Sequence, residues 1–136
     1  MIFDRLNLFS DDQAITATAA STNVVDTGAI GTDAPIVGNH FLGDDAKVEV
    51  IVTAAFNNLT NLAIAFQCDA DEAFGSPTTL STTTVLLAGL VQGYKLTIAI
   101  PVGCERYVRM YYTVAGSAPS TGTITAGITP STDINI

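Results

Sequence analysis

Hydrophobic and polar side chains alternate most regularly near the C-terminal end of the chain. One side of this extended segment carries Val108, Met110, Tyr112 and Val114, and the other carries Tyr107, Arg109, Tyr111 and Thr113. A break at residues 115–121, with Gly116 and Pro119, precedes a second alternating run that ends at Ile128. We therefore predict two strands joined as a hairpin. Its apolar face suits a core, and its aromatic and cationic face suits a partner.

Shorter runs with the same period of two occur along the rest of the chain. The predicted strands are residues 14–21, 23–30, 48–56, 62–69, 78–87 and 94–101, followed by the C-terminal pair. No stretch has the 3.6-residue period of a long amphipathic helix. About eight short strands at this spacing predict an all-β fold, namely an antiparallel two-sheet sandwich with jelly roll as the leading topology. The length fits one domain, residues 1–136.

Residues 1–12 form a separate apolar pattern that ends in a polar Ser-Asp-Asp sequence. After Met1 and Ile2, the segment has four further apolar residues, Phe3, Leu6, Leu8 and Phe9. The segment is too short for an independent helix. Two interpretations remain open, which are an extended N-terminal arm that packs on a neighbouring protein and a first edge strand. In the first, the four apolar side chains are the predicted contacts.

Charged residues make up only 13% of the chain, so Thr, Ser and Asn must supply much of the polar surface. Such a surface is typical of a protein in a permanent complex, where Lys and Glu are depleted. The net charge is −8, and the five basic residues form no run, which excludes nucleic acid and an anionic membrane as partners. No apolar stretch approaches the roughly 20 residues of a membrane span, and no signal-peptide pattern is present. We therefore expect synthesis in a cytoplasm.

The chain offers few groups for catalysis. His40 is the only histidine, no Gly-x-Ser-x-Gly sequence occurs, and no motif joins His40 to Cys68 or Cys104. We therefore predict no enzyme activity, no cofactor and no zinc site. Asp69 and its acidic neighbours Asp71 and Glu72 are interpreted as a solvated turn, with calcium binding left open because loops of a sandwich can supply ligands together.

Three tyrosines allow a second function. Tyr94, Tyr107 and Tyr111 would suit a sugar-binding module, although packing within a sheet or at an interface is the favoured interpretation. The stripe of Tyr107, Arg109 and Tyr111 is predicted to join copies of the chain. The structural alternative is that Arg109 pairs with a carboxylate on the neighbouring strand.

Three long segments carry a resemblance to a known family. Residues 7–29 (NLFSDDQAITATAASTNVVDTGA), 54–79 and 105–128 (ERYVRMYYTVAGSAPSTGTITAGI) resemble the jelly-roll capsid cement proteins of tailed bacteriophages, as found in a Bordetella phage. The resemblance covers nearly the whole chain and contains no catalytic signature. It adds to the pattern of strands and charges described above.

The resemblance implies a non-enzymatic structural protein of the virion. Such a cement or decoration protein forms a homo-oligomer, a dimer or trimer, on the outer capsid surface and stabilises contacts between major capsid proteins. Synthesis would take place in the cytoplasm of the bacterial host. The alternative function is a carbohydrate- or receptor-binding jelly-roll module of a phage particle. The resemblance implies no role for individual residues, so the predicted contacts rest on the sequence pattern.

Overall fold

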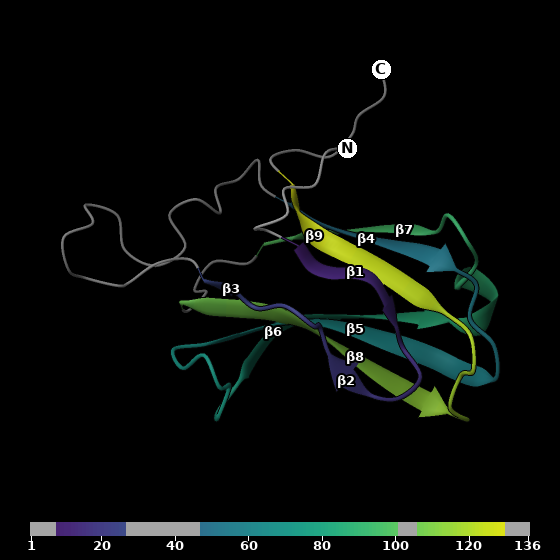
Figure 1. The fold of residues 1–136 in the computed structure, drawn as a ribbon, viewed down its shortest axis with the longest axis horizontal. Helices are drawn as coiled ribbons and strands as arrows, with labels where there is room; N and C mark the ends of the chain where they lie inside the picture. Colours follow the sequence, from purple (N-terminus) through teal and green to yellow (C-terminus); the bar gives the residue numbers. More distant parts are fainter. Residues whose placement is uncertain (1–7, 27–46, 101–105, 130–136) are drawn as a thin grey trace, which may run out of the picture.

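The computed structural model describes residues 8–26, 47–100 and 106–129, which form two antiparallel sheets packed face to face (Figure 1). The strands are β1 (Leu8–Ala14), β2 (Ala19–Ala20), β3 (Val25–Asp26), β4 (Lys47–Ala54), β5 (Leu59–Asp69), β6 (Thr78–Leu86), β7 (Lys95–Ala99), β8 (Tyr107–Gly116) and β9 (Thr123–Thr129). A 3-10 turn, η2 (Leu87–Gly89), follows β6. Within the described ranges no helix has the length and apolar character needed to cross a membrane.

The order of the strands identifies the sandwich as a jelly roll. One sheet has the order β1-β9-β4-β7, and the other has the order β2-β8-β5-β6, with β3 also paired to β8. Because β2 and β3 pair with successive parts of β8, they occupy one strand position between them. The described chain therefore has eight strand positions divided between two sheets, as in a jelly roll. The predicted all-β, two-sheet sandwich is confirmed.

The predicted C-terminal hairpin is wrong, because β8 and β9 belong to different sheets. The connection between them crosses the end of the sandwich beside the connection from β4 to β5. There the Asn57 side chain accepts hydrogen bonds from the backbone N–H groups of Ser120 and Thr121, at 2.8 and 3.2 Å. Gly122 has φ +129°, and a Cβ atom on it would lie 2.4 Å from the Phe56 ring. These contacts hold the two crossing connections together.

The N-terminal segment is an edge strand from Leu8 onward, paired with β9. The Ser-Asp-Asp sequence that we expected to end the pattern lies inside this strand. Two register shifts interrupt the pairing there, and Asp12 has φ +47°. Such bulges in an edge strand allow Asp11 and Asp12 to remain exposed without ending the strand. The arm interpretation is therefore wrong for residues 8–12, and residues 1–7 lie outside the described part of the chain.

The first of the next two predicted strands is much shorter in the structure. Of residues 14–21, Ala14 ends β1 and only Ala19–Ala20 form a further strand. Of residues 23–30, Val25–Asp26 form β3, and residues 27–30 lie outside the described part of the chain. The side chain of Gln13 explains part of the difference, since it bonds to the backbone on both sides of Ser21, where β2 ends. Its amide nitrogen donates to the Ala20 carbonyl at 3.0 Å, and its oxygen accepts from the Thr22 backbone N–H at 2.9 Å.

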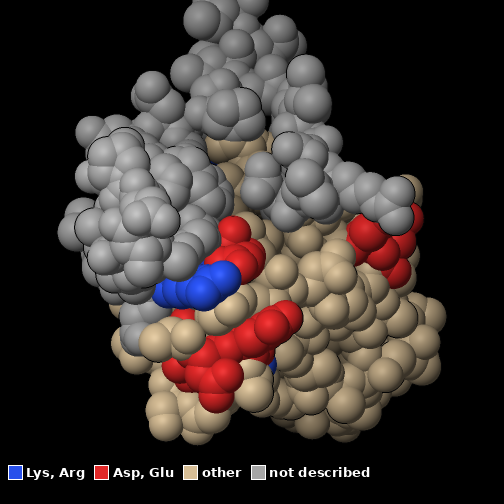
Figure 2. Space-filling view, turned by 60° about the vertical axis from the view of Figure 1, so that its left-hand side comes forward, with Lys and Arg blue, Asp and Glu red and all other residues tan. Residues whose placement is uncertain are grey.

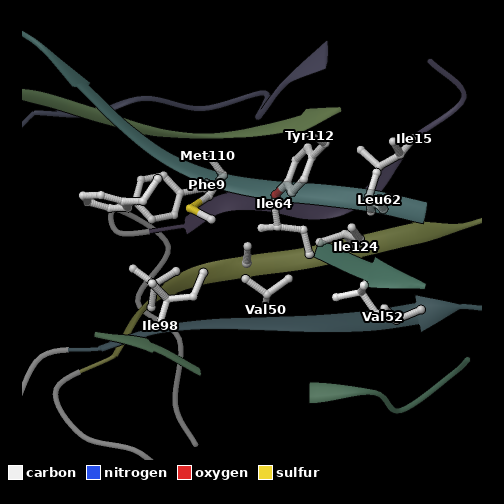
Figure 3. Packing of buried hydrophobic residues seen from close by; sticks show 14 of the residues in the cluster. Phe9, Ile15, Val50, Val52, Leu62, Ile64, Ile98, Met110, Tyr112 and Ile124 are labelled. Atoms are coloured by element: carbon white, nitrogen blue, oxygen red, sulfur yellow. The ribbon is translucent and has the colours of Figure 1, made fainter. Parts of the chain in front are cut away.

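The hydrophobic core lies between the two sheets, where side chains of both meet (Figure 3). Leu62, Ile64, Met110 and Tyr112 come from one sheet, and Val50, Val52, Ile98 and Ile124 come from the other. Each strand supplies alternate residues to this layer, as the period of two predicts. The predicted inner face of β8 is confirmed, because Val108, Met110 and Tyr112 are all fully buried.

A series of hydrogen-bonded side chains crosses this core. The Tyr112 hydroxyl lies 2.8 Å from Ser10 Oγ, which in turn donates to the side-chain oxygen of Gln13 at 2.7 Å. Since the Ser10 proton is directed to Gln13, Tyr112 donates its own proton to Ser10. Burial raises the pKa of the Tyr112 phenol above its ordinary value, while the hydrogen bond to Ser10 opposes that shift. These hydrogen bonds therefore connect β8 to β1 across the sandwich.

Candidate interaction surface

The outer face of β8 carries the residues that the sequence pattern assigned to a partner. Tyr107, Arg109 and Tyr111 all lie on this face and are half-buried, while Thr113 further along is exposed. Their neighbours on β5 are short or polar, with Asp69 opposite Tyr107, Gln67 opposite Arg109 and Ala65 opposite Tyr111. The small Ala65 leaves Tyr111 as the taller side chain of its pair. The predicted separation of two faces along β8 is confirmed.

Arg109 is held by three neighbours. Its Nε atom donates to the Gln67 side-chain oxygen at 3.0 Å. Its guanidinium lies 4.2 Å from the centre of the Phe74 ring and 5.3 Å from the centre of the Tyr111 ring. Both distances are within the range of a cation–π contact. The cross-strand partner is therefore a neutral amide, where the sequence-based alternative expected a carboxylate.

We call this group the Arg109 patch, defined as Gln67, Phe74, Tyr107, Arg109 and Tyr111. Phe74 reaches it from the connection between β5 and β6, where it has φ +53°. A positive φ is uncommon for a bulky residue and requires support from its surroundings. The Phe74 backbone N–H donates to the Asp71 carbonyl at 3.0 Å, which closes the turn that directs the ring toward Arg109.

Asp69 provides the support for this turn. One carboxylate oxygen accepts from the backbone N–H of Asp71 at 3.0 Å, and the other accepts from that of Ser76 at 2.9 Å. These hydrogen bonds stabilise the charged form and lower the pKa of Asp69, with Arg109 adding a smaller attraction. A second aspartate, Asp71, accepts from the Ala73 backbone N–H at 3.1 Å. The acidic residues thus shape the connection that carries Phe74.

A second cation borders the patch. Arg106 donates from Nε and one terminal nitrogen to the two carboxylate oxygens of Asp26, at 2.8 and 2.9 Å. This hydrogen bonding raises the pKa of Arg106, and its guanidinium also lies 5.0 Å from the centre of the Tyr107 ring. Figure 2 shows basic and acidic side chains grouped together on this end of the molecule, within a surface that is otherwise mostly uncharged. The pair joins β3 to the start of β8.

The other predicted contact residues lie elsewhere. Phe9 is fully buried in the core of its own chain, against Phe66 with ring centres 6.3 Å apart. It therefore has no surface to offer a neighbour, and the prediction of Phe9 as an anchor is corrected. Leu8 is half-buried at the start of β1. Phe3 and Leu6 lie outside the described residues, so their predicted role stays a prediction.

Sequence reasoning missed three members of this surface. Phe74 follows an acidic run, so we interpreted its segment only as a solvated turn. Gln67 lies between Phe66 and Cys68, whose side chains point into the core, so the period of two could have placed Gln67 on the outer face. Arg106 gave no signal, because its partner Asp26 is 80 positions away in the sequence.

The remaining sequence-based candidates do not join the patch. Tyr94 precedes β7 in the other sheet and packs against the hydrophobic core, so it shares no platform with Tyr107 and Tyr111. Among the residues that the structure describes, no group of three or more His, Cys, Asp or Glu is arranged to hold a metal ion. Cys68 is buried in the core. His40 and Cys104 lie outside the described ranges.

These features define the class of protein, a jelly-roll sandwich with an ordered aromatic and cationic patch on one outer face. The sequence profile of the Bbp16 family matches residues 9–131 of the chain, so the chain belongs to the Bbp16 family. It is therefore phage-related, as the family name points to a Bordetella phage protein. This finding confirms the phage part of the resemblance noted from the sequence.

Solved structures give a further comparison. The chain is similar to a protein described as "Crystal structure of PirA", with a TM-score of 0.49 and 16% sequence identity. The similarity covers 89% of this chain and 94% of that one. No curated protein matches the chain.

Proposed function

We propose that this protein is a cement, or decoration, protein that binds the outer surface of a phage capsid. In this proposal it is not an enzyme and needs no cofactor. It stabilises contacts between major capsid proteins. Membership of a phage-related family supports a place in the phage particle, and the Arg109 patch is the observation that supports a binding role.

The patch suits this role because it is ordered before a partner arrives. Arg109 is already fixed by Gln67 and Phe74, and the turn below Phe74 is fixed by Asp69. Binding therefore costs little of the side-chain entropy that free arginines and loops lose. Tyr and Arg are also the side chains most often found at interface hot spots. Such a patch supplies a contact of fixed shape to a repeated surface.

We assign the patch to the major capsid protein rather than to a second copy of this chain. In a symmetric contact centred on Arg109, the residue at the two-fold axis meets its own counterpart. Two Arg109 guanidinium groups would then approach each other. Like charges that face each other across a contact destabilise it. A capsid protein has no such restriction.

Repetition of the shell makes modest contacts sufficient. When several copies are joined in one oligomer, each further contact with the shell becomes intramolecular, and the overall affinity rises without new contacts. The negative charge of the chain also keeps the free protein soluble and away from the packaged genome. Capsid stabilisation then follows from contacts that span the boundaries between capsid proteins.

The proposal is tested with purified capsids that lack the protein. The chain is added at increasing concentration, and bound protein is measured after the capsids are sedimented. We expect saturable binding that Arg109→Ala weakens by about tenfold or more. Lys95→Ala is the matched control, because it removes an exposed positive charge from the other sheet, and it should leave binding unchanged.

Two results would contradict the proposal. One is the absence of binding of the unaltered chain to capsids. The other is equal weakening by Arg109→Ala and Lys95→Ala, which would indicate a general charge effect instead of a contact. If the chain fails to bind capsids but binds a glycan saturably, the alternative of a carbohydrate- or receptor-binding module is supported instead.

A further inference from the structure

In the described part of the chain the two sheets end in four edges, and three of these edges carry features that oppose pairing with another chain. β1 has exposed Asp11 and Asp12 and an irregular register. β7 has five residues, including the exposed Lys95. The edge opposite β6 is divided between β2 and β3, which have two residues each. Charges, bulges and short strands are the usual means by which proteins block edge-to-edge association.

The fourth edge, β6, lacks these features along most of its length. It has nine residues, none of them charged, and six are Thr or Val. It pairs with β5 from end to end with one register shift near its start. On its other side it has no strand partner among the described residues. Backbone groups on that side are therefore available to another strand, and β-branched side chains favour such pairing.

β6 also exposes more apolar surface than its neighbours. Leu86 at its end is 64% exposed, and Val91 just beyond the following turn is 52% exposed. These are two of the three large hydrophobic residues that are exposed in the described part of the chain. The outward-facing Thr82 and Thr84 lie between this apolar end and the start of the strand, and they too are exposed. A partner strand along β6 would cover the threonines and Leu86 together.

We propose that β6 pairs with β6 of a second copy of this chain, antiparallel and about a two-fold axis near Thr82. Charge argues for this occupant. Copies with a net charge of −8 repel each other, so they meet most easily where no charged side chain is present. Each β6 begins just after the acidic connection that holds Asp71 and Glu72. In an antiparallel pair these connections lie at opposite ends, about 27 Å apart.

The same geometry suits the side chains. With the axis at Thr82, the two Thr82 side chains face each other. Because of the register shift between Ser81 and Thr79, Thr79 of each copy is on the same face as Thr82, so Thr84 and Leu86 of one copy lie beside Thr79 of its partner. Paired threonines are favourable across antiparallel strands, and each Leu86 loses exposure to water. The contact requires no capsid protein, so its test is independent of the proposed cement function. It makes one continuous sheet from the five-stranded sheets of two copies.

Sedimentation velocity of the full chain over a range of concentrations tests the pairing. We expect the unaltered chain to form a dimer and Thr82→Lys and Thr82→Glu each to sediment as monomers, because like charges then face each other across the axis. An equimolar mixture of these two variants should restore the dimer. Thr113→Lys is the control, since Thr113 is exposed on the same face of the sheet but not on an edge strand, and it should remain dimeric.

Circular dichroism and thermal unfolding of each variant separate loss of pairing from loss of fold. A folded monomer for both Thr82 variants, with recovery in the mixture, supports the pairing. The proposal is overturned if the unaltered chain is a monomer at every concentration. It is also overturned if folded Thr82→Lys associates as well as the unaltered chain does.

Discussion

The two faces of β8 are made from alternate residues of one strand, yet they are ordered by different means. The inner face is fully buried from Val108 to Tyr112 and packs against the other sheet, with Tyr112 bonded to Ser10. The outer face is half-buried and is held by Gln67 and Phe74 of its own sheet and connection. Burial supplies stability to the first face, while local polar and aromatic contacts supply shape to the second.

The difference implies that stability and binding can be altered separately in this protein. A change on the inner face removes apolar contacts from the core and should lower the free energy of unfolding. A change on the outer face leaves the core intact and should alter the affinity for partners. The predictions below test this separation from the largest expected effect on stability to the smallest.

Met110→Ala should have the largest effect. The side chain is fully buried between the sheets, and its removal leaves a cavity (Figure 3). Such replacements lower the free energy of unfolding by about 2–5 kcal/mol. Urea unfolding measures the change, and Thr113→Ala on the exposed side of the same strand serves as the control. A loss near that of the control would show that the inner face does not carry the stability.

Tyr112→Phe should have an intermediate effect. It keeps the buried ring but removes the proton that Tyr112 donates to Ser10, while Ser10 retains its bond to Gln13. The expected loss is about 1 kcal/mol, typical of one hydrogen bond. Tyr111→Phe is the matched control, because it removes the same hydroxyl from the outer face. Equal losses of unfolding free energy in the two variants would contradict the role assigned to the buried hydrogen bond between Tyr112 and Ser10.

Arg109→Ala should change stability by less than about 1 kcal/mol, as expected for a half-buried surface residue. This replacement should instead weaken capsid binding. Met110→Ala, by contrast, should mainly lower stability. Thermal unfolding and binding measured on the same sample give the two values. Loss of the fold in Arg109→Ala would show that the outer face is structural.

Acid should loosen the patch before it unfolds the sandwich. Because the folded pKa of Asp69 is lowered, its contribution is present above its ordinary value of 3.8 and is lost as pH falls through the folded value. Hydrogen exchange at the Asp71 and Ser76 amides should then become faster relative to exchange in β8. In Asp69→Asn this dependence on pH should disappear. If exchange in Asp69→Asn depends on pH as it does in the unaltered chain, another titrating group is responsible for the effect.

Local patterns were enough to predict the two faces of β8, because alternation depends only on neighbouring residues. Which sheet each strand joins depends on distant contacts, such as those of Asn57 with Ser120 and Thr121, so the predicted hairpin was wrong. The same limit hid Phe74, whose place beside Arg109 depends on the turn held by Asp69. The position of Phe9 in the sequence identified an apolar residue, but it did not indicate that this side chain would be buried in the core of its own chain.

The most direct test of the cement proposal is cryo-electron microscopy of capsids that lack the protein, after addition of the purified chain. We predict ordered density for a two-sheet sandwich at the boundaries between major capsid proteins, with the outer face of β8 turned toward the shell. Capsids without added density, or density in which this face points to solvent, would contradict the assignment.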